Sequence, residues 1–232
     1  MIVLGLDTTT RQGSLAVMRD GALLETAALP PGQPAACLPE EVGALVARHG
    51  ISLDQVGAFA VAVGPGSFTG LRIGVATMQG FAFARQRPLL GVSGLEALAL
   101  AAGAGAVATW VDAWRGEVYA AVYRDGVVAG EPTVDEPGSL LAGIARVFGA
   151  DPVRFIGDGA VRYQARIEEA QVGWRLRDPA TPLLAGLVAQ IGHGRLEAGE
   201  TGAPGAVRPL YVRRPDVELV RSARRGMEPL RP

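Results

Sequence analysis

Apolar and polar positions along the chain follow one pattern twice. Residues 3–24 read VLGLDTTTRQGSLAVMRDGALL, and residues 108–128 read ATWVDAWRGEVYAAVYRDGVV. In each stretch an apolar strand ends in Asp, a Gly-bearing turn follows, and a second apolar strand ends in Arg-Asp-Gly. The Asp-Gly pairs predict hairpin turns, because both central residues of such a turn need positive φ. Each stretch therefore predicts three antiparallel strands, and the two halves resemble copies of one unit.

Helices and strands alternate after each set of strands. The apolar spacing predicts helices at 38–49, 70–86, 138–148, 160–169 and 182–198, strands at 58–63, 88–92 and 153–157, and a helix opened by a Ser93–Glu96 capping box. This order is typical of a duplicated actin-like (ASKHA, RNase H-like) α/β fold rather than a Rossmann fold. We expect two lobes, each with a mixed five-stranded sheet. The N-terminal lobe, with the partner-binding helices, spans residues 1–103, the C-terminal lobe spans 104–215, and residues 216–232 form a flexible tail.

The amino-acid composition excludes several kinds of binding and catalysis. The net charge is −1, 49% of the 232 residues are hydrophobic, and all 22 basic residues are Arg. No overall charge attracts nucleic acid or an anionic membrane, and lysine-dependent phosphate loops and Schiff bases are excluded. The lone Cys37 is expected to be a small buried hydrophobe in a reducing cytoplasm. We expect neither a signal peptide nor a membrane segment.

The glycine-rich stretch GPGSFTGLRIG (64–74) raises the question of a phosphate site. Its spacing misses the dinucleotide fingerprint, no acid follows the next strand, and a Walker loop would need Lys. A geometric role is favoured, in which the chain turns sharply and a hydroxyl caps the next helix. The residues expected to position that helix are Gly64, Gly66, Ser67, Thr69 and Gly70.

The helix after this turn carries no charge between Arg72 and Arg85 and is apolar on all sides. Such a helix is either covered on two faces in the core or forms one side of a protein interface. We favour an interface shared with the helix at 38–49. The residues predicted to form it are Leu38, Val42, Leu45, Leu71, Val75, Met78 and Ala82.

The first turn of each half is the candidate for cleft chemistry. In actin-like proteins these turns hold ATP, and the candidate residues here are Asp7, Thr8, Thr9, Gly13 and Asp112. Trp114 and Arg115 are bulky where a close backbone approach would need Gly, so the turns look degenerate. Neither His49 nor His193 lies in a metal-binding pattern. We expect no metal and no cofactor, with weak ATP or ADP binding left open; a free-standing ATP-dependent phosphotransferase of the sugar-kinase type is the alternative function.

The motifs resemble a known family. LGLDTTT, GPGSFTGLRIG, GVSGLEALA, VDAWRGEVYAAVY and LYVRR are similar to the corresponding stretches of TsaB, also called YeaZ, from Ile2 to about Arg214. This family is required for threonylcarbamoyladenosine in bacterial transfer RNA. One departure is Gln33, which stands where many relatives carry His.

The resemblance implies a non-catalytic role in the cytoplasm. TsaB pairs with TsaD, a paralogue that carries the metal-binding histidines and transfers threonylcarbamoyl to an adenosine beside the anticodon, and a small ATPase, TsaE, joins them. The helices that flank the glycine motif form the interface with TsaD, or a homodimer when TsaD is absent. Transfer RNA would be contacted only within the complex. The arginines of the tail, from Asp216 onward, are expected to be solvated.

Overall fold

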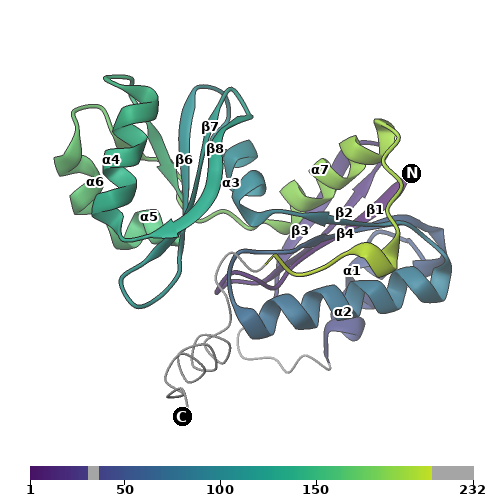
Figure 1. The fold of residues 1–232 in the computed structure, drawn as a ribbon. Helices are drawn as coiled ribbons and strands as arrows, with labels where there is room; N and C mark the ends of the chain where they lie inside the picture. The colour runs from purple at the N-terminus through teal and green to yellow at the C-terminus, as the bar shows by residue number, and fades with distance from the viewer. Residues whose placement is uncertain (31–36, 211–232) are drawn as a thin grey trace, which may run out of the picture.

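The computed structural model describes residues 1–30 and 37–210, arranged as two lobes that each surround one sheet (Figure 1). The first sheet has five strands in the order β3-β2-β1-β4-β5. Strand β1 pairs antiparallel with β2 and parallel with β4, so the sheet is mixed as expected. The strands are β1 (Ile2–Asp7), β2 (Ser14–Arg19), β3 (Ala22–Ala28), β4 (Val56–Ala62) and β5 (Leu89–Val92).

The second sheet repeats this order as β10-β9-β6-β7-β8, which confirms the duplicated fold. Its strands are β6 (Ala106–Asp112), β7 (Val118–Arg124), β8 (Val127–Asp135), β9 (Arg154–Ile156) and β10 (Arg175–Leu176). The two-residue β10 was not predicted, because two residues are too short to carry a pattern. Both Asp-Gly hairpins are present: Asp20 and Asp125 have φ of 51°, and the glycines after them have φ of 80° and 79°.

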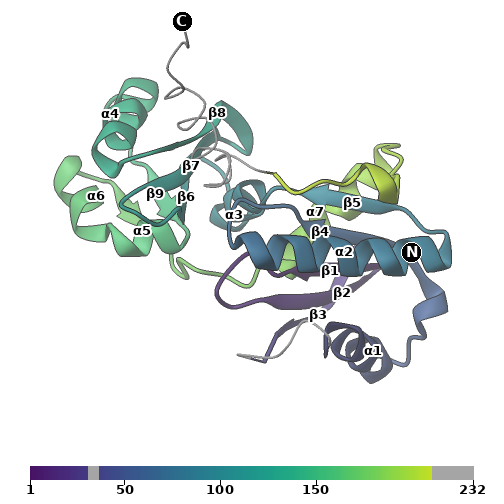
Figure 2. The same cartoon turned by 60° about the horizontal axis from the view of Figure 1, so that its bottom comes forward.

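Helices from opposite ends of the chain cover the first sheet. Helices α1 (Leu38–Arg48) and α2 (Phe68–Arg85) share one apolar cluster with β1, β2 and β4. Helix α7 (Ala185–Glu197) lies on the opposite face, where it contacts β1, β2 and β4 (Figures 1 and 2). This contact is close: a Cβ at Gly5 would stand 2.3 Å from the carbonyl oxygen of Ala185. The helices expected at 38–49, 70–86 and 182–198 are present, with ends that differ by up to three residues.

The second sheet lies between two groups of helices. Helices α4 (Pro137–Phe148), α5 (Asp158–Arg162) and α6 (Gln164–Ala170) share an apolar cluster on one face, and α3 (Gly94–Ala102) packs against β6 and β9. The single helix predicted at 160–169 is wrong, because the chain leaves helical geometry at Tyr163, where φ is −112°. Short 3₁₀ turns, η2 (Leu53–Gln55) and η3 (Pro204–Ala206), complete the described elements.

One apolar cluster joins the two lobes. It contains Ala58 and Val92 of the first sheet, Val107 and Ile156 of the second, and residues of α3 and α7. An ion pair supports it, because Arg195 of α7 donates to Glu96 of α3 at 2.5 Å. A division at residue 103 therefore separates the two sheets but not all the helices. Helix α7 belongs to the second half of the sequence but packs on the first sheet.

The pair formed by Glu96 also corrects the predicted capping box. Ser93 is the N-cap of α3 but its side chain makes no cap hydrogen bond, and the carboxylate of Glu96 is turned toward Arg195 instead.

Cys37 is half-buried rather than buried. Within residues 1–30 and 37–210, no helix has the length and apolar character that a membrane crossing requires. Gln33, the tail at 216–232 and most of LYVRR lie outside the described residues.

Candidate functional site

A buried aspartate organises the turn that follows β1. The side chain of Asp7 is fully buried at the end of β1. One carboxylate oxygen accepts hydrogen bonds from the backbone N–H and the hydroxyl of Thr9, at 2.8 and 2.7 Å, and the other accepts from the hydroxyl of Thr10 at 2.6 Å. Burial raises the pKa of Asp7, and the hydrogen bonds from Thr10 and Thr9 oppose that rise. The carboxylate is thus engaged within the protein.

The glycine motif packs directly against this turn. A Cβ at Gly66 would stand 2.4 Å from the carbonyl oxygen of Thr9, and a Cβ at Gly70 would stand 1.8 Å from the carbonyl oxygen of Thr8. At Gly74 it would stand 2.2 Å from the Thr8 hydroxyl, which itself donates to the carbonyl oxygen of Gly70 at 2.6 Å. The glycines therefore allow the start of α2 to approach the threonine turn.

The expected geometric role of the motif agrees with the local backbone. Gly64 and Gly66 have φ of 107° and 155°, which side chains rarely adopt. Ser67 caps α2: its hydroxyl accepts from the backbone N–H of Gly70 at 3.2 Å, and its own N–H donates to the carbonyl oxygen of Thr9. Ser67 is therefore the cap of α2, whereas Thr69, the other hydroxyl residue of the motif, is exposed on the helix.

The residues predicted to form an interface have side chains that point into the lobe instead. All seven lie in the core of the first lobe with side chains at most 6% exposed: Leu38, Val42, Leu45, Leu71, Val75, Met78 and Ala82. They face the sheet, so they stabilise the lobe and are not open to a partner. Helix α2 is apolar on all sides, so its sequence gives no signal for which side is covered, whereas the apolar stripe of α1 marks the buried side of that helix.

Helix α2 does expose a different side. We call it the α2 face, and it consists of Phe68, Thr69, Arg72, Ala76, Gly80, Phe83 and Ala84. Phe83 is 60% exposed, and the Arg72 guanidinium lies 4.0 Å from the centre of the Phe68 ring. A hollow of about 520 Å³ beside Phe83, Pro88 and Leu196 extends this surface. An exposed, mostly uncharged helix face of this kind is typical of protein contacts.

The second aspartate turn is built differently. Asp112, at the end of β6, accepts a hydrogen bond from the N–H of Trp114 at 3.0 Å and an ion pair from Arg162 at 2.7 Å. Its own N–H donates to Asp158 of α5. Trp114 and Arg115 have φ of 60° and 55°, so two bulky residues occupy left-handed conformations. The carboxylates of Asp7 and Asp112, one in each turn, therefore both have partners within the protein. Gly13, in the first turn, is half-buried, and a Cβ at this position would stand 2.9 Å from the Leu29 side chain.

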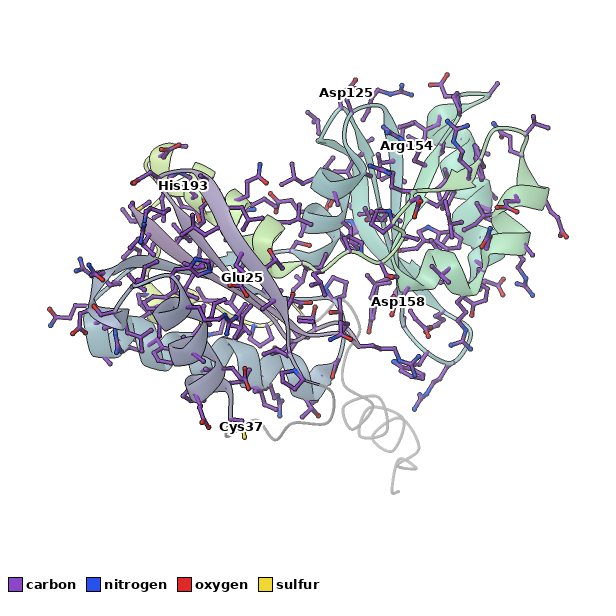
Figure 3. All side chains as sticks on the ribbon, turned by 180° about the vertical axis from the view of Figure 1, so that it is seen from behind. Glu25, Cys37, Asp125, Arg154, Asp158 and His193 are labelled. Atoms are coloured by element: carbon purple, nitrogen blue, oxygen red, sulfur yellow. The ribbon has the colours of Figure 1, made fainter. Side chains whose placement is uncertain are left out.

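The two histidines lie apart from these turns and from each other. The Nε2 atom of His49, at the end of α1, is 2.7 Å from Glu25 of β3. His193 lies within α7, where its Nε2 atom is 3.4 Å from Glu197. Figure 3 shows Glu25 and His193 at separate places on the first lobe. Among the described residues, no group of three or more His, Cys, Asp or Glu side chains is arranged to hold a metal ion.

Comparisons with known proteins identify the family. Residues 35–168 match the model of the family described as TsaD, tRNA N6-adenosine threonylcarbamoyltransferase. The tRNA threonylcarbamoyladenosine biosynthesis protein TsaB of Escherichia coli is 37% identical over 57% of this chain and 61% of its own length. The solved structure of YeaZ from Pseudomonas aeruginosa is 31% identical with a TM-score of 0.75, over 91% of this chain and all of that one. The chain belongs to the TsaB (YeaZ) family.

The relatives also confirm the fold beyond this family. Component A of the (R)-2-hydroxyglutaryl-CoA dehydratase of Acidaminococcus fermentans is 11% identical with a TM-score of 0.56. The match covers 85% of this chain and 99% of the dehydratase component. The chain spans less than two thirds of the first curated relatives. It covers 61% of the E. coli protein and 56% of an uncharacterized Mycobacterium leprae protein, which is 31% identical over 94% of this chain. Family and fold are thus established, and what the chain does is a separate question.

Proposed function

We propose that this chain is a non-catalytic subunit in the biosynthesis of threonylcarbamoyladenosine in transfer RNA. In this role it binds and supports a TsaD-type paralogue, which transfers threonylcarbamoyl to the adenosine next to the anticodon. The observation that carries the proposal is a division of labour within one lobe: the aspartate turn is closed by its own threonines, and the α2 face is open. Membership of the TsaB family supports the pathway, as does the E. coli relative, a tRNA threonylcarbamoyladenosine biosynthesis protein.

The closed aspartate turn argues against catalysis by this chain. A carboxylate that assists phosphoryl transfer must reach a magnesium ion or a bound water molecule. Both oxygens of Asp7 already accept hydrogen bonds, and the side chain is fully buried. The start of α2 packs against the same turn. We therefore expect no magnesium-ATP binding that depends on Asp7, which isothermal calorimetry with an Asp7→Asn control would check.

The α2 face supports a protein partner. Exposed small residues at Ala76, Gly80 and Ala84 follow one another at intervals of four, which places them along one side of the helix. A second helix can approach such a side closely. We expect a TsaD-type paralogue to occupy it in the complex and a second copy of this chain to occupy it otherwise. A TsaE-type ATPase would join only the complex, and transfer RNA would be modified only there, in the cytoplasm.

Reconstitution tests the proposed function directly. The TsaD-type and TsaE-type proteins, the enzyme that supplies the threonylcarbamoyl adenylate, and unmodified transfer RNA are combined with and without this chain. We expect modified nucleoside, measured by mass spectrometry after nuclease digestion, only when the chain is present. Equal yields in both mixtures would contradict the proposal. Modification by this chain with the TsaD-type protein omitted would contradict its non-catalytic part.

A further inference from the structure

The second lobe displays a tryptophan at the tip of the turn between β6 and β7. Trp114 is 61% exposed, whereas the other two tryptophans, Trp110 and Trp174, are at most 3% exposed. Tryptophan is highly buried on average, because a large apolar ring gains free energy when it leaves water. An exposed tryptophan therefore suggests that something else covers the ring.

The turn holds this ring in a fixed and unfavourable backbone conformation. Trp114 and Arg115 both have positive φ, which costs a residue with a side chain roughly 1–2 kcal/mol. The N–H of Ala113 donates to the carbonyl oxygen of Glu117, and the N–H of Glu117 donates to that of Trp114, both at 3.0 Å. The side chain of Asp112 holds the N–H of Trp114. These three hydrogen bonds define the backbone conformation of the turn that carries the indole ring.

Further arginine and aromatic side chains are linked to this turn. Arg162 of α5 pairs with Asp112 and also lies 5.6 Å from the centre of the Tyr163 ring. Arg166 of α6 lies 5.9 Å from the same ring. Asp158, labelled in Figure 3, accepts the N–H of Asp112 at the base of the group. We call this group the Trp114 surface: Trp114, Arg115, Arg162, Tyr163 and Arg166.

We propose that the Trp114 surface binds an unpaired stretch of RNA. Trp114 stacks on a base, and the guanidinium groups contact the phosphates on either side. Aromatic side chains bind single strands in this way because every base offers a flat π-face, and arginine adds charge and stacking. Of the two acids beside the turn, Asp112 is paired with Arg162, and Asp158 accepts the N–H of Asp112. The proposal rests on the proposed function, which supplies a transfer RNA as the RNA.

Intrinsic fluorescence makes the proposal testable on the full-length chain. Because Trp114 is the exposed tryptophan among three, its emission should be quenched when an unmodified transfer RNA transcript, or its isolated anticodon stem-loop, is added at low salt. Trp114→Ala should weaken binding roughly 5-fold or more, and Trp114→Phe should keep most of it. Arg166→Ala should reduce the slope of log affinity against log salt by about 0.7 if it contacts one phosphate of a single strand.

Val127→Ala provides the matched control. Val127 is 70% exposed and pairs with Arg124, at the end of β7 away from the Trp114 turn. We expect Val127→Ala to bind RNA as tightly as the wild type. The proposal is overturned if neither RNA quenches the wild-type emission, if Trp114→Ala keeps wild-type affinity, or if that variant loses a protein partner while RNA binding is unchanged. None of these results alters the reconstitution test, so the two proposals fail independently.

Discussion

Thr8 and Gly70, which are far apart in the sequence, hold α2 against the end of β1. The hydroxyl of Thr8 donates to the carbonyl oxygen of Gly70 at 2.6 Å, and a Cβ at Gly70 would stand 1.8 Å from the carbonyl oxygen of Thr8. The hydroxyl of one partner and the missing side chain of the other are both needed for this contact. The two family motifs, LGLDTTT and GPGSFTGLRIG, are therefore one packed unit.

Adding a methyl group at Gly70 should disrupt this unit. Because the clash is with backbone, the helix must shift, and we expect Gly70→Ala to lower the free energy of unfolding by about 3 kcal/mol. Gly80→Ala, in the same helix, is the matched control: nothing lies within 4 Å of its Cβ, so it should raise stability by about 0.5–1 kcal/mol. Urea unfolding of both variants measures the difference. Equal effects of the two substitutions would show that the Thr8 contact is unimportant.

A charge on the α2 face should prevent binding of the TsaD-type paralogue. Ala76 is exposed at the middle of this face, so Ala76→Arg should leave the fold intact but place an unpaired charge in the contact. We expect at least a 10-fold loss of affinity in co-purification followed by calorimetry. Ala165→Arg, at an exposed position of α6 in the other lobe, controls for the added charge. Binding by Ala76→Arg that matches this control would place the partner elsewhere.

Burial of Asp7 makes its contribution to stability depend on pH. Since the pKa of Asp7 is raised in the folded state, the folded state holds its proton more tightly than the unfolded chain, whose pKa is near 3.8. The resulting stabilisation is complete below pH 3.8 and is lost as the pH rises through the folded pKa. The unfolding free energy of the wild type should therefore fall relative to that of Asp7→Asn as the pH is raised from about 3.5, which is below the unfolded pKa, to about 7.

Urea unfolding over this pH range provides the measurement. Asp54→Asn is the control for loss of a carboxylate, because the Asp54 side chain is 91% exposed. A difference between wild type and Asp7→Asn that grows with pH in favour of the wild type would show that the hydrogen bonds from Thr9 and Thr10 outweigh burial.

The fold was accessible from the sequence because its signals are local. The apolar strands, the Asp-Gly turns at 20–21 and 125–126, and the repeat of one pattern indicate the fold class and the duplication. Tertiary contacts decided the rest. The acid of the predicted capping box at Ser93 pairs instead with Arg195, which lies far along the chain. A local motif cannot reveal such a competing partner.

The candidate site was predicted less well for a physical reason. The apolar stripe of an amphipathic helix marks its buried side, but α2 is apolar on all sides. Nothing in its sequence therefore distinguishes Met78, which is buried, from Ala76, which is exposed. The geometric role of Gly64 and Gly66 was predictable, because it follows from the conformations glycine allows. That Asp7 is engaged by Thr9 and Thr10 could have been suspected from the run of three threonines after it.

The position of α7 has a consequence for the order in which the protein assembles. The first sheet is complete in sequence at Val92, but the helix that covers one of its faces begins at Ala185. During synthesis, the apolar residues of that face, such as Val3 and Ala60, must wait for almost the whole second lobe to emerge. The N-terminal half is therefore a poor candidate for independent folding, and a nascent chain halted before α7 would offer chaperones an uncovered sheet.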